Sequence, residues 1–234
     1  MAKVVIFSGA GLSAESGLKT FRDSGGLWEE YDVNVVCNHD SLEKNEALTL
    51  EFYDKRRREL EFKAPNFVHR KIFEIKEEHG SSVAIITQNV DNLFEKAGID
   101  NEDVIHLHGF MPEVRCRSCE GVFDIAYKKI EEFKGGICPN CSSKLRPNIV
   151  FFGESAPMYE KLSQELSDCE FLVVIGTSGE VISVNGMAKA AKYSILNNLE
   201  ESESIDDTLF SKVLYRKATA AIDEIAEKID EYLK

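Results

Sequence analysis

Four of the six cysteines in this 234-residue chain form two Cys-x-x-Cys pairs, and such pairs are typical of a metal site. Eighteen residues separate the pairs, which fits the C-x2-C-x18-C-x2-C spacing of a tetrahedral zinc site with four thiolate ligands. Because the protein fills all four positions, no open position is left for a reacting water. We therefore predict a structural zinc ion that holds a small ribbon together. The expected ligands are Cys116, Cys119, Cys138 and Cys141.

Other uses of these cysteines fit less well. Six cysteines can form three disulfides in a secreted protein, but paired Cys-x-x-Cys spacing suits metal binding in a reducing compartment better. A ribbon that binds nucleic acid is a second alternative, but the intervening segment places Lys128 and Lys129 beside Glu131 and has no clear basic stripe. Cys37 and Cys169 remain as expected free thiols.

A glycine-rich turn follows the apolar run from Val4 to Phe7, and Gly9, Gly11 and Ala14 fit the pattern G-x-G-x-x-A. In dinucleotide-binding proteins such glycines let backbone N–H groups approach a pyrophosphate at a helix amino terminus. A tight structural turn is the alternative. The position between a predicted strand and a predicted helix favours dinucleotide binding.

The next segment does not fit an ordinary dehydrogenase. A dehydrogenase would continue with a second strand that ends in an acidic residue about 20 residues later, and that strand is missing. Residues 16–28 are instead rich in glycine and end in the only tryptophan of the chain, Trp28. Such a segment is more typical of a mobile loop over a cofactor, which argues against simple hydride transfer.

Polar side chains and histidines follow the apolar run from Val83 to Ile86. Gln88, Asn89 and Asp91 come directly after this run and can reach a ligand at the carboxyl edge of a sheet, or can merely stabilise a turn. His106 and His108 suit proton transfer near neutral pH. In an extended segment both would face the same way, and taken singly each is more often structural.

Tyr53 and Arg56 lie three residues apart in a predicted helix and therefore share one of its faces. A phenol and a guanidinium together can bind a carboxylate. The alternative is an ordinary charged helix face in solvent.

The elements that must position these residues have an α/β pattern. The apolar runs are typical of parallel strands that are covered on both faces, with ligands bound at their carboxyl ends. Predicted strands span 4–7, 83–86, 149–152, 171–175 and 193–196, and predicted helices span 42–62, 66–78 and 218–233. Two insertions interrupt the pattern, a charged helical block near residues 29–78 and the cysteine block near 112–145.

Composition limits the possible functions. The net charge of -13 argues against a general nucleic-acid-binding protein, because the surface repels phosphate backbones. No apolar stretch approaches the roughly 20 residues of a membrane span, and the amino terminus lacks the pattern of a secretion signal. We expect a soluble, cytoplasmic protein.

The motifs, taken in order, resemble those of the sirtuins, which are NAD-dependent protein-lysine deacylases. The resemblance extends over nearly the whole chain. It rests on the segments Gly9-Ala10-Gly11-Leu12-Ser13, Ser16-Gly17, Phe21-Arg22, Thr87-Gln88-Asn89-Val90-Asp91, His108-Gly109, the two cysteine pairs, Phe152-Gly153-Glu154 and Gly176-Thr177-Ser178.

The resemblance implies an inverted Rossmann NAD-binding domain with a parallel sheet, plus a smaller domain made of a zinc ribbon and a helical module. The implied NAD domain comprises residues 1–28, 79–111 and 146–234. The helical module would be 29–78 and the zinc module 112–145. The active site would lie in the cleft between the domains.

The resemblance also implies roles for individual residues. His108 would be the general base and Asn89 a second catalytic residue. The implied NAD-binding residues are Gly9, Ala10, Gly11, Ser13, Ser16, Phe21, Arg22, Trp28, Gln88, Asn89, Asp91, Gly176, Thr177, Ser178, Asn198, Leu199, Glu200 and Ala218. The implied peptide-binding residues are Phe152, Gly153, Glu154 and Val181.

In the mechanism that the resemblance implies, the acyl-lysine carbonyl oxygen attacks the nicotinamide ribose at C1', nicotinamide leaves and an imidate forms. The base lets the ribose 2'-hydroxyl attack the imidate carbon, and water then yields free lysine and 2'-O-acyl-ADP-ribose. NAD is consumed. In one sirtuin subgroup a Tyr-x-x-Arg pair binds the distal carboxylate of succinyl- or malonyl-lysine, and Tyr53 and Arg56 match this pair, so we expect succinyl and malonyl groups to be preferred over acetyl groups.

The chain departs from the sirtuin pattern at Lys19-Thr20, within Gly179 to Asn185, and at Arg216. These departures concern substrate preference and rate more than the reaction. Two alternatives from other classes stay open: a mono-ADP-ribosyltransferase, and a binding module that senses NAD or ADP-ribose without turnover. We expect acyl-lysine proteins or peptides as partners, and neither nucleic acid nor a membrane.

Overall fold

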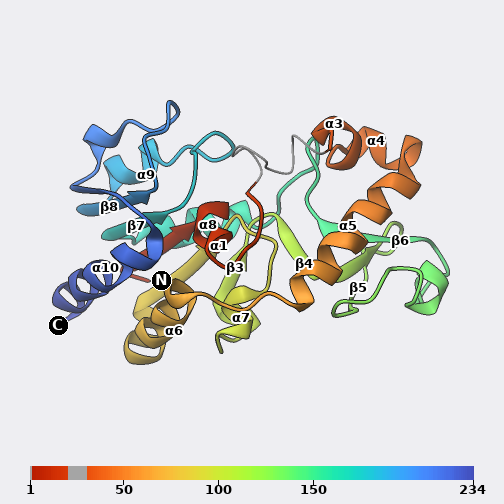
Figure 1. Cartoon of the computed structure of the whole chain (residues 1–234), viewed down its shortest axis with the longest axis horizontal. Helices are drawn as coiled ribbons and strands as arrows, with labels where there is room; N and C mark the ends of the chain where they lie inside the picture. Colours follow the sequence, from red (N-terminus) through yellow and green to blue (C-terminus); the bar gives the residue numbers. More distant parts are fainter. Residues whose placement is uncertain (1, 21–30) are drawn as a thin grey trace.

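A six-stranded parallel sheet forms the main part of the computed structural model, which describes residues 2–20 and 31–234 (Figure 1). The spatial order β3-β2-β1-β7-β8-β9 is that of a doubly wound Rossmann-type sheet, in which the strand order reverses between β1 and β7. The strands are β1 (Val4–Ser8), β2 (Val83–Thr87), β3 (Val104–His106), β7 (Phe171–Ile175), β8 (Tyr193–Asn198) and β9 (Lys212–Tyr215).

Helices cover both faces of this sheet because its central strands are apolar on both faces. Every residue of β1, β2 and β7 is buried. One face packs against α6 (Phe67–His79) and α10 (Ala218–Leu233), and the other against α8 (Tyr159–Ser167) and α9 (Asn185–Ala190). The result is a three-layer α/β domain.

The smaller domain combines a three-stranded antiparallel sheet with helices, and lies beside the main sheet in Figure 1. Its strands, in the order β5-β4-β6, are β4 (Gly109–Cys116), β5 (Val122–Asp124) and β6 (Leu145–Ile149). Its helices are α3 (Val33–Val36), α4 (His39–Lys44) and α5 (Glu46–Glu61).

A buried ion pair attaches α5 to the segment that carries the cysteines. Arg57 Nη1 lies 2.6 Å from Asp54 Oδ1, and Arg57 Nε donates to the Met111 carbonyl at 2.8 Å. Asp54 also accepts from the Ile130 N–H at 3.1 Å. The helical module and the zinc module therefore form one unit.

The predicted strand at 149–152 is wrong. The strand β6 ends at Ile149 and belongs to the small antiparallel sheet. Residues 150–152 are extended, but the Phe152 N–H donates to the Cys37 carbonyl at 2.8 Å, and the Phe151 side chain packs into the core of the small domain.

Edge strands β3 and β9 went unpredicted because they are short and partly exposed. The strand β8 extends two residues beyond the predicted 193–196 and ends at Asn198.

The helix α6 also differs from expectation. Val68, Ile72 and Ile75 pack into the core of the main sheet, so the structure places this helix with the large domain and not with the helical module of 29–78. The other helices among residues 2–20 and 31–234 are α1 (Ala10–Ala14) and α7 (Leu93–Lys96). Short 3-10 turns span 80–82, 101–103, 134–136 and 207–209. Within the described residues, no helix has the length and apolar character needed to cross a membrane.

Candidate active site

A cavity of about 950 Å³ opens at the carboxyl ends of the parallel strands, where the main sheet meets the small domain. Its place beside β1 and β7 is the point of strand reversal at which doubly wound sheets bind ligands. The predicted nucleotide-binding residues in its wall are Gly9, Ala10, Gly11, Ser13, Gln88, Asn89, Asp91, Gly176, Thr177, Ser178, Asn198, Leu199, Glu200 and Ala218. The predicted acyl- and peptide-binding residues in its wall are Tyr53, Arg56, Phe152, Gly153, Glu154 and Val181.

A few predicted residues do not join them. Ser16 is not part of the cavity wall, and its buried hydroxyl has no hydrogen-bond partner in the described part of the chain. Phe21, Arg22 and Trp28 lie outside the described residues.

The glycines of the first loop let it pack closely against the loop after β7. The N–H groups of Gly9 and Gly11 donate to the carbonyls of Ile175 and Gly176, at 3.0 and 2.9 Å. A Cβ atom on Gly9 would lie 2.6 Å from the Gly176 oxygen. Glycine is therefore needed because the loops after β1 and β7 pack backbone against backbone, and these two N–H groups are not available to a pyrophosphate.

Asn89, Ser13 and Asp91 form a connected polar group at the floor of the cavity. Asn89 Nδ2 donates to Ser13 Oγ at 3.0 Å and to the Gly9 carbonyl at 3.1 Å. Ser13 Oγ in turn donates to Asp91 Oδ2 at 2.9 Å. Burial raises the pKa of Asp91. These hydrogen bonds fix the side chains in place before any ligand arrives.

A second polar group joins the loops after β2, β7 and β8. Gln88 Nε2 donates to Thr177 Oγ1 at 2.8 Å. Asn198 bonds the backbone of Thr177 twice, accepting from its N–H at 3.1 Å and donating to its carbonyl at 2.9 Å. These bonds hold this side of the cavity as one rigid wall.

His108 lies in the wall of the cavity, and its ring makes two contacts. Nδ1 lies 3.1 Å from the Gln88 carbonyl oxygen, and Nε2 lies 3.1 Å from the Tyr159 hydroxyl. Burial lowers the pKa of His108, and the hydrogen bond to the Gln88 carbonyl opposes this only in part. The imidazole is therefore neutral at neutral pH, as a general base must be.

His106 has a structural environment. The strand β3 ends at His106, so the two histidines do not share one extended segment. The expectation that both side chains face the same way is therefore wrong. His106 Nδ1 lies 3.0 Å from the Asn89 carbonyl, and Nε2 lies 2.9 Å from Glu95 Oε1. Burial alone would lower the pKa of His106, but the hydrogen bond to Glu95 raises it overall. This buried pair supports the loop that carries Asn89.

Tyr53 and Arg56 reach the cavity from α5 and do not form a solvated helix face. The Tyr53 side chain is 4% exposed, its ring stacks on Phe151 with centroids 5.5 Å apart, and its hydroxyl lies 3.3 Å from Cys37 Sγ. Burial raises the pKa of Tyr53, so the phenol stays protonated and can donate. Within the described residues, the one ion pair of Arg56 is a long contact of 3.8 Å with Glu59.

The loop at Phe152 and Gly153 lines the cavity, but the side chain of Glu154 points into the small domain. Glu154 accepts hydrogen bonds from Arg146, from Arg115 at 3.2 Å and from His39 at 2.9 Å. Only 9% of this side chain is exposed. Its carboxylate is thus used within the protein and is not presented to a peptide.

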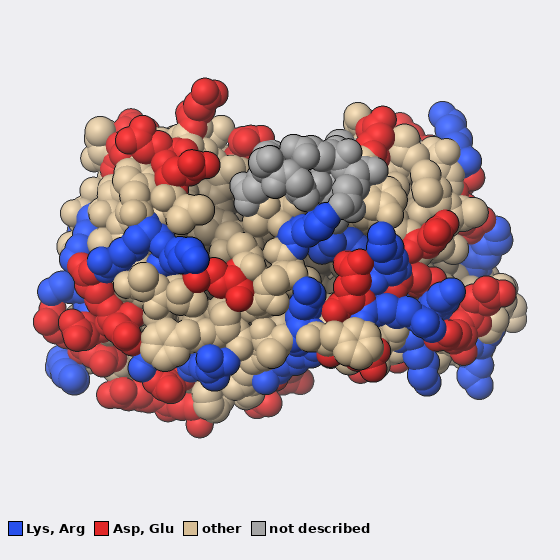
Figure 2. Space-filling model, in the orientation of Figure 1, with Lys and Arg blue, Asp and Glu red and all other residues tan. Residues whose placement is uncertain are grey.

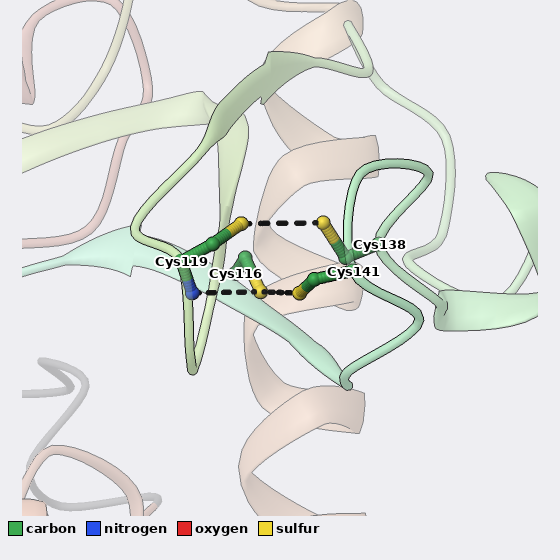
Figure 3. A group of neighbouring side chains, drawn as sticks. All are labelled: Cys116, Cys119, Cys138 and Cys141. Atoms are coloured by element: carbon green, nitrogen blue, oxygen red, sulfur yellow. Dashed lines mark hydrogen bonds between the residues drawn. The ribbon is translucent and has the colours of Figure 1, made fainter.

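The four predicted zinc ligands lie together, as Figure 3 shows. All four sulfur atoms are within 4.8 Å of one another; Cys116 and Cys141 are 3.4 Å apart and Cys119 and Cys138 are 3.7 Å apart. Four sulfurs around zinc at about 2.3 Å would be roughly 3.8 Å apart, so this arrangement fits the ion. Hydrogen bonds from the N–H groups of Cys119 and Ser118 lower the pKa of Cys116 to about 6, which favours the thiolate that a metal needs.

Several residues in the cavity wall were not predicted. Tyr159 follows no motif, and Cys37 was expected only as a free thiol. Asn197 lines the cavity beside Asn198, and this polar pair at the end of an apolar run was a usable sign. A single sequence offers no comparable sign for Tyr159.

Comparison with known proteins decides the family. A match to the Sir2 family extends over residues 9–183. The chain belongs to the Sir2 family. The NAD-dependent protein deacylase of Campylobacter jejuni strain RM1221 is 48% identical over 235 residues, which covers 100% of this chain and 98% of the relative. The Sir2-family chain described here is accordingly an enzyme of that class, an NAD-dependent protein deacylase.

Solved structures agree with this assignment. A crystal structure of a Sir2 homolog–NAD complex is 32% identical, with a TM-score of 0.83, and the match covers 99% of this chain and 90% of that one. A variant Sir2 homologue in complex with 2'-O-acetyl ADP ribose is 32% identical, with a TM-score of 0.84, and the match covers 99% of this chain and 93% of that one. The cavity of this Sir2-family enzyme suits NAD, because its volume is in the upper part of the range of ligand sites and its polar floor can bond ribose hydroxyls.

Proposed function

We propose that this Sir2-family deacylase removes succinyl and malonyl groups from protein lysines in preference to acetyl groups. The supporting observation is that Tyr53 and Arg56 line the same cavity as His108. An acyl-lysine whose carbonyl lies near His108 can therefore extend its far end toward a phenol and a guanidinium. The proposed products are nicotinamide, free lysine and 2'-O-acyl-ADP-ribose.

The surroundings of Arg56 favour an anionic acyl group. Its side chain is 14% exposed, and burial lowers its pKa, which shows that the charge is poorly solvated. An acyl carboxylate placed there would supply the close partner that Glu59 does not. A charge-assisted hydrogen bond in such a low-dielectric site is stronger than the same bond in water. An acetyl group offers no such bond.

At the ribose, NAD supplies an activated carbon from which nicotinamide departs. His108 acts as general base and takes a proton from a ribose hydroxyl at its Nε2 atom. Asn89 and Asp91, fixed by Ser13, would hold the nicotinamide ribose and carboxamide, and Gln88 the ribose. These residues hold and move protons, and none of them is a nucleophile.

The two ends of the cleft would receive the rest of the ligands. Asn198, Leu199, Glu200 and Ala218 would face the adenosine half. Phe152 and Val181, which are 46% and 43% exposed, would flank an acyl-peptide that pairs by its backbone with the two loops. This division assigns NAD to the large domain and the peptide to the cleft between the domains.

We propose action in the cytoplasm, where thiols stay reduced, since all six cysteines are unpaired.

Substitution of Arg56 tests the proposal. We expect Arg56→Met to lower kcat/KM for a succinyl-peptide by roughly 10- to 100-fold, the value of a hydrogen bond to a charged group, and to change kcat/KM for the matching acetyl-peptide little. Arg58→Met is the matched control, because Arg58 lies on the same helix, is about half exposed and pairs with Glu132 outside the cavity. The proposed preference would be wrong if wild type favoured the acetyl-peptide and Arg56→Met left succinyl turnover unchanged.

A further inference from the structure

The two hydrogen bonds of His108 together define its protonation. The Gln88 carbonyl can only accept, so Nδ1 of the neutral ring carries the hydrogen. Nε2 then carries the lone pair, and the Tyr159 hydroxyl donates to it across 3.1 Å. The hydroxyl of Tyr159 therefore lies on the nitrogen that must take a proton in the proposed reaction.

The position of Tyr159 is suited to this contact and contributes little to the fold. It is the first residue of α8, it follows the loop that contains Phe152 and Gly153, and it lines the cavity. It is 37% exposed, whereas Leu162 of the same helix is buried in the core and Leu166 packs against it. The aromatic ring touches His108 at a centroid separation of 6.1 Å.

We propose that Tyr159 is a positioning residue for the general base: its hydroxyl holds the His108 ring with Nε2 basic in the free enzyme, and bound substrates displace it. This inference rests on the role of His108 in the proposed function. Nε2 cannot accept from the tyrosine and from a ribose hydroxyl along the same lone pair. The tyrosine must therefore leave Nε2 when the reacting complex forms.

The contact has a consequence for titration. A donor on Nε2 stabilises the neutral imidazole and so keeps the pKa of His108 lower in the free enzyme than it would otherwise be. Two acidic groups of the cavity wall have other partners: Asp91, in the loop after β2, accepts from Ser13, and Glu154, in the loop before α8, accepts from Arg146. Arg56 on α5 is in ionic contact with Glu59.

Tyr159→Phe removes the hydroxyl and keeps the ring. Profiles of kcat/KM against pH report groups of the free enzyme, and profiles of kcat report groups of the bound complex. With succinyl-peptide and NAD both well below saturation for kcat/KM, and both saturating for kcat, we expect the acidic limb of kcat/KM to move up by about half a pH unit, the value of one neutral hydrogen bond, while the limb of kcat stays in place. Tyr215→Phe is the matched control, since Tyr215 is 38% exposed and its hydroxyl bonds Asp207 outside the cavity.

An NMR titration of the His108 ring in the ligand-free protein gives a readout that does not depend on turnover. We expect the pKa of His108 to rise in Tyr159→Phe and to stay unchanged in Tyr215→Phe. An unchanged His108 pKa in Tyr159→Phe would overturn the contact. Equal shifts in the kcat/KM and kcat profiles, or loss of kcat at every pH, would contradict the proposed displacement of the Tyr159 hydroxyl by bound substrates. A failure of the proposed role of His108 would give a different result. His108→Ala would then still form the deacylation products, with or without the Tyr159→Phe substitution.

Discussion

Glu154 is the residue through which the loop at Phe152 and Gly153 is fixed to the rest of the small domain. Its carboxylate bonds Arg146 and Arg115 from the antiparallel sheet, His39 from α4, and the N–H of Phe151 at 2.8 Å. Resemblance to a family motif places Glu154 in the correct loop but does not indicate where its side chain points. The direction of that side chain depends on arginines 8 and 39 residues away in sequence, which the antiparallel sheet brings together.

The hydrogen bonds of Glu154 make stability depend on pH. Burial alone would raise the pKa of Glu154, but hydrogen bonds from Arg146 and the Phe151 N–H lower it to about 2, against about 4.5 in the unfolded chain. Because the folded pKa is the lower one, this stabilisation is complete above pH 4.5 and is lost as the pH falls toward 2. We expect Glu154→Gln to lower the free energy of unfolding by about 3 kcal/mol at pH 7 and to flatten its fall over this range.

Urea unfolding at a series of pH values measures this effect. Glu160→Gln is the control, because Glu160 is exposed on the first turn of α8. It should leave both the stability at pH 7 and the slope below pH 4.5 nearly as in wild type. An equal effect of both variants would mean that the network around Glu154 contributes nothing specific.

Residues that follow strands were the easiest part of the site to predict. Gln88, Asn89 and Asp91 come after a fully apolar run, and parallel strands bring their carboxyl ends to one edge. Tyr159 was missed for a physical reason: it meets His108 across 51 residues of chain and belongs to no local pattern. Contacts of this kind are set by tertiary packing, which a single sequence does not reveal.

At the scale of elements, the zinc ribbon depends on its metal for a core. Its buried cluster contains six residues, Val114, Cys116, Ile125, Ile130, Cys138 and Leu145, and two of these are zinc ligands. So small a cluster cannot hold a fold alone. The ribbon also carries Arg115 and ends in the strand of Arg146, and both arginines pair with Glu154. Loss of ordered structure in the ribbon would therefore loosen Glu154 and the loop at Phe152 and Gly153.

Removal of the metal should therefore loosen the ribbon first. We expect a chelator to raise amide hydrogen exchange across residues 112–145 by at least roughly tenfold, while β1 and β7 stay protected, because they lie in a separate core. Hydrogen exchange followed by mass spectrometry measures this directly, and re-addition of zinc should restore protection. Uniform loss of protection over the chain, or none in the ribbon, would contradict the separate role of the metal.

The elements were predictable to the extent that their hydrophobic pattern is local. Four of the five predicted strands and the helix α10 follow from apolar runs that the sheet buries. The run at 149–152 has the same pattern, yet it packs into the small domain, because its neighbours in the chain are held there by β6. The edge strand β9 has only one buried residue, so no apolar run marks it.

At the scale of the whole molecule, the small domain and the main sheet line one cavity, so Tyr53 and Arg56 share it with the polar group of Ser13, Asn89 and Asp91. The main sheet supplies the loops after β1, β2, β7 and β8, the helical insertion supplies α5, and the segment after β6 supplies the loop at Phe152. Acidic side chains are spread over the face in Figure 2 with lysines and arginines among them, so the charge of -13 does not form one patch on this face. In the proposed function, an acidic surface would suit lysine-bearing peptides, and Arg56 would supply a local positive charge for an anionic acyl group.

Product analysis tests the central claim most directly. The purified chain is incubated with NAD and an equimolar mixture of succinyl- and acetyl-peptides of one sequence, and the products are identified by mass spectrometry. We predict that free lysine peptide, nicotinamide and succinyl-ADP-ribose form in equal amounts, faster than the acetyl products, and that His108→Ala forms none of them. ADP-ribose attached to protein, binding of NAD without any product, or faster release of the acetyl group would contradict the account.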